Sequence, residues 1–413
     1  MTFKILGLGL AGFLALGGPE KAHASVVEIR QQGLDFQFFR DGQPFTPKGA
    51  GVAGVGSSER FDALVAAGAN AVRIYGGGQD ILDRAHAAGL GVLLGISGDN
   101  LDLARQSVET HKDHPALLMW ALGNEMERRT SDVSALWSNM ETIAAMIKQV
   151  DGKHPCMTVV AEGGVSMLAD MKRLAPSLDA VGINSYGPAG SLGTRVLAAG
   201  WDKPFFVTEF GPKGFWEVPK TAWNVLIEQT STEKADMYLA SYRSLAGHSG
   251  RCLGTFAFLW GPRQKKTHTW FGMFLPDGSP LDTVEAMAEA WTGKPAADKG
   301  PRIGPGKIKT GPGSGRQRRF QPGSTIKASL DVFDPDGPAP TVTWDLRVDV
   351  SDHPAGEGIP EPDSFPLPGA IVLAEGSIAC IKMPAEAGNY RIFAYAKDAE
   401  GRAATANIPI QVR

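Results

Sequence analysis

The sequence predicts a (β/α)8 barrel followed by a small all-β sandwich. From about residue 46 to 292, short apolar runs alternate eight times with amphipathic helical patterns, and roughly 250 residues is the usual size of eight βα units. From about residue 320 onward, short segments of alternating apolar and polar residues are separated by turn signals, which is typical of an antiparallel sandwich. A doubly wound open sheet is the alternative for the first region, but such sheets usually have fewer strands and a nucleotide-binding fingerprint.

The first 24 residues have the pattern of a signal peptide. Lys4 supplies a positive charge, residues 5–16 form an apolar run, and Ala22 and Ala24 are the small residues that cleavage before Ser25 requires. The run is too short to span a bilayer, and no later segment reaches about 18 apolar residues, so we expect an exported protein that is not embedded in a membrane. Its place would be periplasmic or extracellular. An uncleaved N-terminal anchor is the alternative.

The eight predicted barrel strands are continuous apolar runs, because parallel strands in a barrel are covered on both faces. They are residues 45–52, 69–76, 91–97, 117–125, 156–162, 180–186, 205–210 and 254–260. Helical patterns include residues 58–67, 79–88, 132–150, 232–246 and 281–291. The barrel domain is therefore expected over residues 25–293.

One glycine motif at the first strand is also the pattern of a nucleotide-binding loop. Gly49, Gly51 and Gly54 satisfy G-x-G-x-x-G between a predicted strand and a helix. The next strand ends in Val72-Arg73-Ile74-Tyr75, without the acidic residue that a ribose hydroxyl requires. The glycines therefore indicate a tight first loop under a substrate, and no cofactor is expected.

The second domain follows a change in composition. Residues 294–319 are rich in Gly, Pro, Lys and Arg, which predicts a linker whose Arg316, Arg318 and Arg319 are solvated; contact with an acidic surface is the alternative. The sandwich is expected over residues 320–413, as a module with a spacing or binding role. Its predicted strands are residues 325–332, 341–348, 371–381, 389–397 and 403–412.

Composition excludes several classes of protein. Hydrophobic residues make up 43% of the 413 residues and charged residues 21%, which is the balance of a globular protein. With 41 Lys and Arg against 44 Asp and Glu, the net charge of −3 argues against nucleic acid as a partner. Three cysteines cannot form a disulfide scaffold or a Cys-rich zinc module, and we expect buried free thiols at Cys156, Cys252 and Cys380. His111 and His114 have no third ligand in metal spacing, so no metal is expected.

The ends of the predicted strands carry the residues that could perform chemistry, since the loops there form the open face of a barrel. These residues are Arg73, Tyr75, Asn124, Glu125, Glu162, Asn184, Tyr186, Glu209 and Trp260. Glu125 and Glu209 end unusually apolar runs, and a carboxylate in such a place must be hydrogen-bonded, paired or functional. Two carboxylates that face each other across a sugar-sized gap are what glycoside hydrolysis requires.

The motifs around both carboxylates resemble a known group of enzymes. Residues 123–125 (Gly-Asn-Glu) and 208–211 (Thr-Glu-Phe-Gly) are similar to the two signatures of the clan A retaining glycoside hydrolases. Residues 39–49 resemble the start of the barrel in family 2, and residues 71–76 resemble the β-1,3-glucanase and β-1,3-glucanosyltransferase families. The resemblance covers about residues 39–292. The C-terminal segment resembles the immunoglobulin-like or PKD-like modules of secreted glycan-active enzymes.

The resemblance implies a role for each residue. Glu125 would be the general acid/base and Glu209 the nucleophile. Arg73 would keep Glu209 ionised, Tyr186 would orient it, and Asn124 would bind the sugar 2-hydroxyl.

Further candidates would bind the sugar itself. Trp260 would form the floor of the −1 subsite, and Glu162 would bind a sugar hydroxyl. Further candidates for aromatic platforms, on which a sugar ring would stack, are Tyr75, Trp201, Phe215, Trp216 and Trp270.

The sequence thus predicts a monomeric, retaining β-glycosidase that hydrolyses a β-glucan, a β-linked oligo- or polysaccharide, through a covalent glycosyl-enzyme intermediate. A β-glucan transglycosylase would use the same two carboxylates and is the first alternative. A non-catalytic glycan-binding protein is the second.

Overall fold

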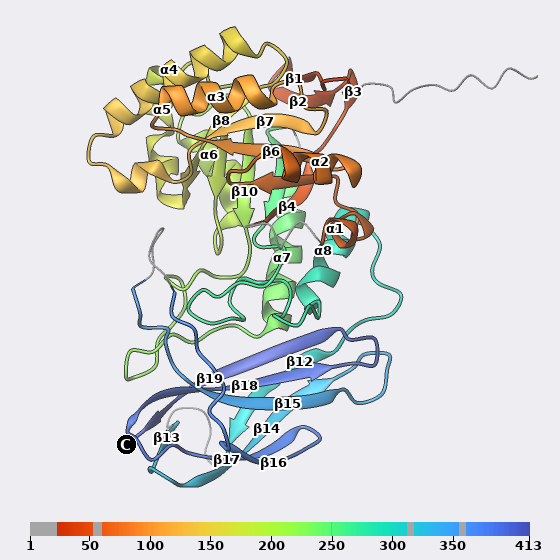
Figure 1. Cartoon of the computed structure of the whole chain (residues 1–413), viewed down its shortest axis with the longest axis vertical. Coiled ribbons are helices and arrows are strands. Elements are labelled where there is room, and N and C mark those ends of the chain that lie inside the picture. Colours follow the sequence, from red (N-terminus) through yellow and green to blue (C-terminus); the bar gives the residue numbers. More distant parts are fainter. Residues whose placement is uncertain (1–22, 53–59, 249, 312–317, 355–360) are drawn as a thin grey trace, which may run out of the picture.

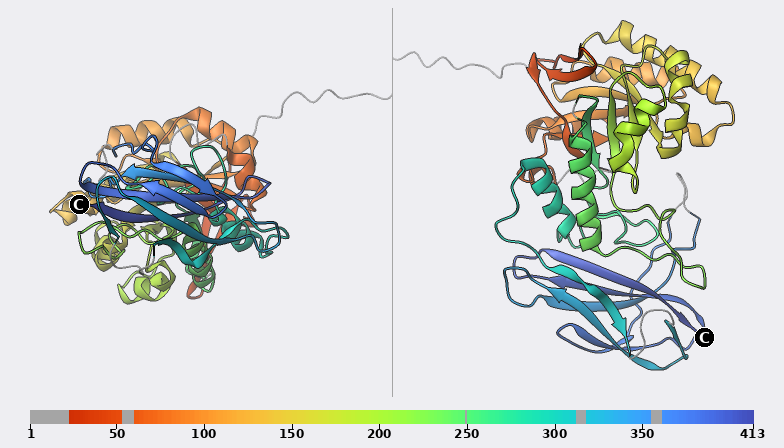
Figure 2. Two further views of the ribbon diagram at one scale, coloured as in Figure 1. Left: turned by 90° about the horizontal axis from the view of Figure 1, so that it is seen from below. Right: turned by 180° about the vertical axis from the view of Figure 1, so that it is seen from behind.

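A computed structural model describes residues 23–52, 60–248, 250–311, 318–354 and 361–413 of the chain. The barrel and the sandwich are stacked along the long axis of the molecule (Figure 1). The view from behind shows the same arrangement, with the C-terminus on the sandwich (Figure 2). The predicted fold class, a (β/α)8 barrel followed by an all-β domain, is confirmed. The predicted signal peptide lies outside the described residues, except for His23 and Ala24.

Eight parallel strands close the barrel in chain order, with the last strand paired to the first. The strands are β4 (Lys48–Val52), β5 (Ala71–Ile74), β6 (Gly91–Ile96), β7 (Leu117–Leu122), β8 (Cys156–Ala161), β9 (Ala180–Asn184), β10 (Phe205–Phe210) and β11 (Cys252–Ala257). The helices are α1 (Phe61–Ala66), α2 (Gln79–Ala87), α3 (Leu101–His111), α4 (Val133–Val150), α5 (Leu168–Leu174), α6 (Leu192–Ala198), α7 (Ser231–Ala246) and α8 (Asp282–Thr292). Short 3-10 turns are η2 (Met126–Arg129), η3 (Glu162–Met167) and η4 (Ala189–Ser191).

All eight predicted strands are present, but several end earlier than predicted. Strand β7 ends at Leu122 because Gly123 and Glu125 have left-handed backbone angles, φ +65° and +50°, which do not continue a strand. Asn124 and Glu125 therefore lie in the loop after β7, and Tyr186 lies in the loop after β9, which ends at Asn184. The first helix begins at Phe61, and its predicted start at residue 58 lies outside the described residues.

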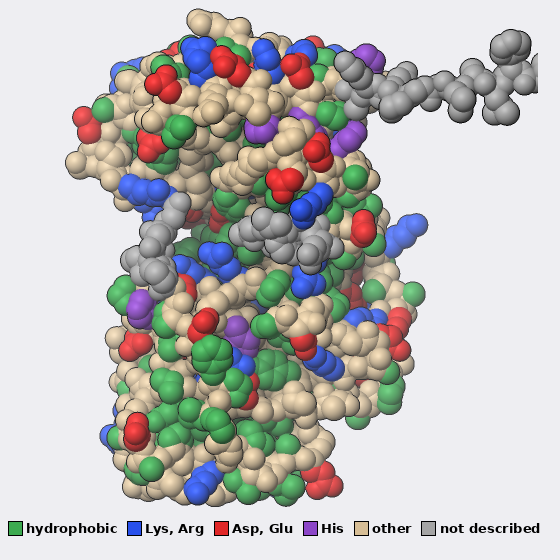
Figure 3. Space-filling view, viewed as in Figure 1, with side chains coloured by type: hydrophobic (Ala, Val, Ile, Leu, Met, Phe, Trp, Pro, Cys, Tyr) green, Lys and Arg blue, Asp and Glu red, His purple; other side chains and the backbone are tan. Residues whose placement is uncertain are grey.

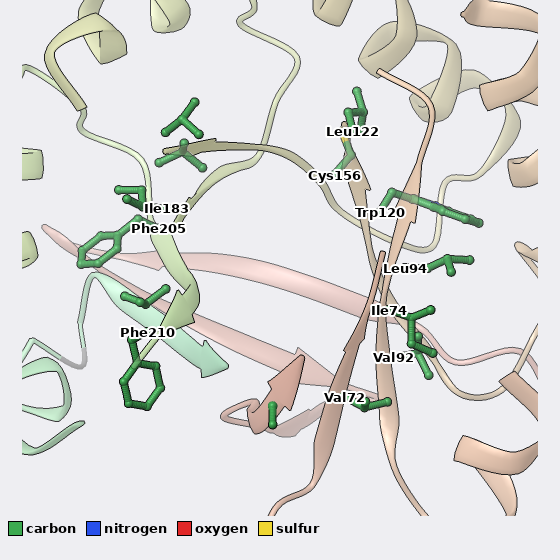
Figure 4. Close-up of a cluster of buried hydrophobic side chains, with 14 of the residues drawn as sticks. Val72, Ile74, Val92, Leu94, Trp120, Leu122, Cys156, Ile183, Phe205 and Phe210 are labelled. Carbon is green, nitrogen blue, oxygen red and sulfur yellow. The ribbon is translucent and has the colours of Figure 1, made fainter. Parts of the chain in front are cut away.

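The main core lies between the strands and the surrounding helices. Side chains that point outward from β5 to β10 are buried there together, as Figure 4 shows for one part of the cluster. The labelled members are Val72, Ile74, Val92, Leu94, Trp120, Leu122, Cys156, Ile183, Phe205 and Phe210. Burial on both faces of each strand is the reason that the sequence shows continuous apolar runs.

The N-terminal ends of the barrel strands are covered by a small antiparallel sheet that the sequence did not predict. It contains β1 (Val27–Gln32), β2 (Asp35–Arg40) and β3 (Gln43–Pro44). Phe38 is 2% exposed, and its ring lies 5.8 Å from that of Phe206. This sheet closes the face opposite to the candidate site.

The glycines of the first strand pack closely against their neighbours. A Cβ atom at Gly49 would lie 1.9 Å from the carbonyl oxygen of Ala71, and one at Gly51 would lie 2.7 Å from the hydroxyl of Tyr75. Gly54 lies outside the described residues. Close strand packing thus accounts for Gly49 and Gly51, and Gly51 leaves room for Tyr75.

The sandwich consists of two four-stranded sheets around a shared hydrophobic core. One sheet contains, in spatial order, β12 (Arg302–Thr310), β14 (Thr325–Phe333), β17 (Ile378–Lys382) and β16 (Ile371–Glu375). The other contains β13 (Arg319–Phe320), β19 (Ala403–Val412), β18 (Gly388–Lys397) and β15 (Thr341–Val348). The single strand predicted over residues 371–381 is wrong: the chain turns at Gly376, where φ is +54°, and forms a hairpin.

The predicted linker, residues 294–319, is wrong over residues 302–310. Strand β12 pairs with β14 there, and Ile303 and Ile308 are buried in the sandwich core. The guanidinium of Arg319 lies 5.3 Å from the ring centre of Trp223, so this arginine contacts the barrel domain instead of being solvated. Arg316 lies outside the described residues.

Buried polar contacts dock the sandwich on two barrel loops, residues 211–230 after β10 and residues 258–281 after β11. Arg391 is 1% exposed and donates hydrogen bonds to Asp349, to Asn407 and to the carbonyl of Leu226. Glu228 accepts hydrogen bonds from Asn407, Thr267, Thr269 and Lys234. The two domains therefore share a buried, charged interface on the side of the barrel mouth.

The surface charge and the cysteines agree with a globular protein. Acidic and basic side chains are mixed over the face in Figure 3, in keeping with a net charge of −3. Cys156, Cys252 and Cys380 are free thiols; the first two are buried, and Cys380 is half-buried. In the part of the chain that the structure describes, none of the helices is both long and apolar enough to cross a membrane.

Candidate active site

Glu209 lies near the end of β10 and is held by Arg73 on β5, by Tyr75 just after β5 and by Tyr186 just after β9. Its Oε1 atom accepts hydrogen bonds from Arg73 Nη1 at 3.0 Å and from the Tyr75 hydroxyl at 2.9 Å. Its Oε2 atom accepts one from the Tyr186 hydroxyl at 2.5 Å. Glu209 is 6% exposed. These bonds fix the orientation of its carboxylate, and the bond from Tyr186 is the one that the sequence analysis expected.

Arg73 is the cation at the centre of the site. It is 2% exposed, and Nη1 also donates to Asn184 Oδ1 at 3.1 Å and to the carbonyl of Thr208 at 2.8 Å. Its Nη2 atom donates to Asn124 Oδ1 at 2.7 Å. A buried guanidinium with this many acceptors holds the ends of strands β5, β9 and β10 and the loop after β7 in one arrangement.

Glu125 lies in the loop after β7, in an uncommon backbone conformation. Its φ of +50° is left-handed, which costs a residue other than glycine about 1–3 kcal/mol and persists only where the surroundings enforce it. Its N–H donates to the carbonyl of Val159 on β8 at 2.9 Å. The carboxylate accepts hydrogen bonds from Asn184 Nδ2 at 2.9 Å and from Arg128 Nη1 at 2.7 Å.

Asn184 links the two carboxylates. Its Nδ2 group donates to Glu125, while its Oδ1 atom accepts from Arg73, which in turn donates to Glu209. Thr208 Oγ1 also donates to Asn184 Oδ1, at 2.8 Å. The sequence placed Asn184 only among the polar strand ends, and no residue spacing could have indicated this bridging position.

Burial and charge act against each other on Glu209. Burial raises the pKa of Glu209 above its usual range, and the negative charge of Glu125 adds to this. Arg73 lowers the pKa of Glu209, as predicted, and so do the hydrogen bonds from Tyr186 and Tyr75, but burial outweighs them. Burial together with the Glu209 charge raises the pKa of Tyr75 and of Tyr186 well above the usual value, so both remain hydroxyl donors.

Three of the predicted aromatic platforms, Trp260, Trp270 and Trp201, are wrong because their side chains are buried. Trp260 is fully buried: its Nε1 donates to the carbonyl of Arg60, and its ring packs against Phe274 and Trp291 in the main core. Trp270 is 1% exposed and donates to the carbonyl of Lys213. Strand β11 ends at Ala257, three residues before Trp260, so the chain has already turned away from the barrel mouth at that tryptophan.

Phe258 takes the place at the end of the eighth barrel strand that the sequence assigned to Trp260. Its ring is half-buried and makes edge contacts with Tyr75 and Tyr186, at 6.5 Å and 5.9 Å between ring centres. The peptide bond between Phe258 and Leu259 is cis. Its position as the first residue after the apolar strand was the signal that could have identified it.

The remaining platform candidates differ in exposure. Trp216 is 55% exposed beside Tyr186, and Tyr75 is half-buried next to Glu209, so both stay candidates for sugar contact. Phe215 is half-buried in a cluster with Tyr186 and Trp270. Trp201 is 1% exposed and donates to the carbonyl of Pro204, so it packs in the core.

Two cavities open beside the carboxylates. The first, of about 630 Å³, is lined by Arg73, Tyr75 and Asn124 and extends to helix α3; we call it the α3 cavity. The second, of about 340 Å³, is lined by Glu125, Asn184, Tyr186, Glu162 and Trp216; we call it the Trp216 cavity.

Two glutamates shape the Trp216 cavity. Glu162 forms an ion pair with Arg195, and its predicted contact with a sugar hydroxyl stays a prediction. Glu217 accepts hydrogen bonds from the N–H groups of Gly187 and Gly214, and so holds the loop that carries Trp216 against the end of β9.

Of the two histidines that the sequence singled out, His114 makes contacts that hold the fold. His114 Nε2 lies 3.0 Å from Asp83 Oδ1, and His114 Nδ1 accepts a hydrogen bond from the N–H of Ala116. Among the described residues, no group of three or more His, Cys, Asp or Glu side chains is arranged to hold a metal ion.

Part of the barrel matches the model of a known protein family. Residues 97–211 match the family model described as glycosyl hydrolases family 2, TIM barrel domain. The resemblance to clan A glycoside hydrolases predicted from the two motifs is thereby confirmed. Among proteins with curated functions, none matches the chain.

Solved structures share the fold at low sequence identity. A β-glucuronidase from Bacteroides uniformis is 14% identical with a TM-score of 0.51, over 94% of this chain and 48% of that one. A β-glucuronidase from Ruminococcus gnavus is 16% identical with a TM-score of 0.51, over 65% of this chain and 53% of that one. The chain thus spans about half the length of these structures.

Proposed function

We propose that the protein is a retaining β-glycosidase that hydrolyses a β-glucan through a covalent glycosyl-enzyme intermediate. The observation that carries the proposal is the unequal setting of the two carboxylates at the barrel mouth. Glu209 is buried under three hydrogen-bond donors, whereas Glu125 lines the Trp216 cavity beside the exposed Arg128. Retaining enzymes need one carboxylate fixed as nucleophile and a second that exchanges protons with the leaving group and water.

Glu209 is the nucleophile in this proposal. It attacks the anomeric carbon, forms the glycosyl ester and releases the leaving group. Burial removes water that would otherwise solvate the carboxylate, while Arg73, Tyr75 and Tyr186 keep it oriented toward the sugar.

Glu125 is the general acid/base. In the first step it donates a proton to the departing glycosidic oxygen, and in the second it removes a proton from the attacking water. Asn184 holds one of its oxygens, and Arg128, whose side chain is 62% exposed, can leave the other when a sugar enters.

Asn124 binds the 2-hydroxyl in this proposal. Its Oδ1 atom accepts hydrogen bonds from Arg73 and Asn184, so the Nδ2 group is its remaining donor for a sugar oxygen. Such a contact strengthens as positive charge develops on the ring in the transition state.

Transglycosylation is the second candidate. The Trp216 cavity adjoins Glu125 and presents an exposed indole, which would suit an acceptor sugar as well as a leaving group. A sugar hydroxyl would then replace water in the second step.

Product analysis on β-1,2-, β-1,3-, β-1,4- and β-1,6-glucans over time tests these candidates. Aryl β-glucosides belong in the same panel, and aryl β-glucuronides are added because the structures that share the fold are β-glucuronidases. Shorter products alone support hydrolysis, and new longer oligosaccharides support transfer. Binding without turnover of any substrate would mean a glycan-binding protein.

Export is a further part of the proposal, and it rests on the N-terminal sequence pattern alone. Mass determination of the N-terminal peptide of the mature protein tests it. A chain that begins at Ser25 supports export, and one that retains Lys4 contradicts cleavage.

A further inference from the structure

The carboxylate pair lies between two cavities instead of at the bottom of one. Arg73, Tyr75 and Asn124 line the α3 cavity, while Glu125 and Asn184 line the Trp216 cavity. These five side chains belong to one hydrogen-bonded network around Glu209. A ligand that reaches both carboxylates can therefore extend in two directions from them.

The two directions have different chemical roles. Glu125, the proposed proton donor to the leaving group, faces the Trp216 cavity. The part of the substrate that departs must lie on that side. The part that stays attached to Glu209 must then extend toward the α3 cavity, past Asn124 and Tyr75.

The α3 cavity has the size and chemistry of a sugar site. Its volume of about 630 Å³ lies within the range of about 300–1,000 Å³ that ligand pockets have. Its lining includes the charged Arg73, Asp99 and Arg129 close to the carboxylates, and the neutral polar Ser97, Gln106, Ser107 and Thr110 farther along α3. Hydroxyl and amide groups suit the hydroxyls of a neutral sugar.

His111 supplies a second observation. It lines the α3 cavity at the last turn of α3 and is 7% exposed, and its Nδ1 atom has no hydrogen-bond partner among the described residues. This nitrogen is free to bond to a ligand hydroxyl or to an ordered water in the cavity.

We propose that the α3 cavity binds further sugar residues on the non-reducing side of the cleaved bond, so that the protein cleaves inside a β-glucan chain. The proposal rests on the proposed glycosidase function. An enzyme that removes single terminal sugars needs a wall behind the sugar held by Glu209. Here Gly76 and Gly77 line that side, and in the part of the chain that the structure describes a Cβ atom at Gly76 would have no heavy atom within 4 Å.

Three glycine variants test the two directions separately. Among the described residues, a Cβ atom would meet nothing within 4 Å at Gly76, at Gly163 or at Gly152. Gly76 lines the α3 cavity, Gly163 lines the Trp216 cavity, and Gly152 lies outside both, in the loop between α4 and β8. Gly76→Trp and Gly163→Trp would each obstruct one direction, and Gly152→Trp is the matched control.

The measurement is kcat/KM on an aryl β-monoglycoside and on reducing-end-labelled β-gluco-oligosaccharides of two to five units. The native protein should cut internal bonds. In Gly76→Trp, the ratio of the pentasaccharide value to the aryl value should fall at least tenfold. In Gly163→Trp, the bond cut in the pentasaccharide should move toward the reducing end, and Gly152→Trp should match the native protein.

Other results would overturn the inference. Release of single sugars only from the non-reducing end, or an unchanged ratio in Gly76→Trp, would exclude a glycon site in the α3 cavity while leaving the proposed function intact. If no glycoside is turned over, the proposed function itself fails. Binding of one- to five-unit oligosaccharides to Glu209→Gln then decides the inference: affinity that rises with length and falls at least tenfold in Gly76→Trp/Glu209→Gln supports it, and any other pattern contradicts it.

Discussion

At the scale of single residues, the reactivity of Glu209 depends on which neighbours donate to it. Tyr186 donates at 2.5 Å and Tyr75 at 2.9 Å, each to a different oxygen, while burial raises the pKa of the carboxyl. Each donor stabilises the ionised form and so lowers this pKa. These hydrogen bonds therefore offset part of the effect of burial, which favours protonation of Glu209.

Tyr186→Phe removes one of these donors and should have two effects. A hydrogen bond to a charged group contributes about 1.5–3 kcal/mol, so kcat/KM should fall roughly 10- to 150-fold. Because the pKa of Glu209 rises further, the acidic limb of the pH profile of kcat/KM should move to higher pH. Tyr242→Phe on helix α7 is the control. An acidic limb in the same place as in the native protein would show that Tyr186 does not act through Glu209.

At the scale of elements, apolar runs predict the barrel well because each parallel strand is buried on both faces, as the neighbouring Met119 and Trp120 of β7 are. The same pattern does not fix where a strand ends. Trp260 and Phe258 are two residues apart, and only the end of β11 at Ala257 decides which of them faces the site. Strand β12 was missed because glycines, a proline and lysines surround Ile303 and Ile308 and leave no alternating apolar pattern. These two side chains are buried only by their partner sheet.

The loop after β7 gives a test at this scale. Gly123 has φ +65°, and a Cβ atom there would lie 2.2 Å from Met126 Sδ, whereas Gly89 has φ +78° and nothing within 4 Å. Gly89→Ala should therefore cost only the backbone strain, about 1–3 kcal/mol of unfolding free energy. Gly123→Ala should cost more and should also lower kcat at least tenfold, because Asn124 and Glu125 follow directly. Urea unfolding and kinetics check both variants, and equal losses of stability with full activity would contradict this account.

At the scale of the whole molecule, the sandwich supports the barrel mouth instead of acting as a tethered module. It contacts the loops after β10 and β11 through Arg391 and Asn407. Those loops contribute Leu226 and Phe271, which pack with Tyr186 in one buried cluster. Sequence could not reveal this interface, because its contacts join residues more than a hundred positions apart, such as Glu228 and Asn407.

Asn407→Ala tests the docked arrangement. Asn407 donates to Glu228 at 2.8 Å and accepts from Arg391 at 2.7 Å, so its loss leaves two buried charges with fewer partners. The unfolding free energy should fall by about 2–3 kcal/mol, and kcat should fall with it. Asn389→Ala, at the half-buried start of β18, is the control. Two results together would contradict docking: Asn407→Ala as stable as this control, and limited proteolysis that cuts first within residues 302–310 and releases an active barrel. The two domains would then be independent, as the predicted linker implied.

The most direct test of the central claim is azide rescue of Glu209→Ala on an activated aryl β-glycoside. Removing the carboxylate should abolish turnover of both aryl glycoside and glucan, since no other group can form the covalent intermediate. Azide can enter the vacated space beneath the sugar, attack the anomeric carbon and restore release of the aryl group. The account predicts an α-glycosyl azide as the product, identified by NMR. Near-normal turnover of glucan by Glu209→Ala, or a rescued product with the β configuration, would contradict the assignment of Glu209 as the nucleophile.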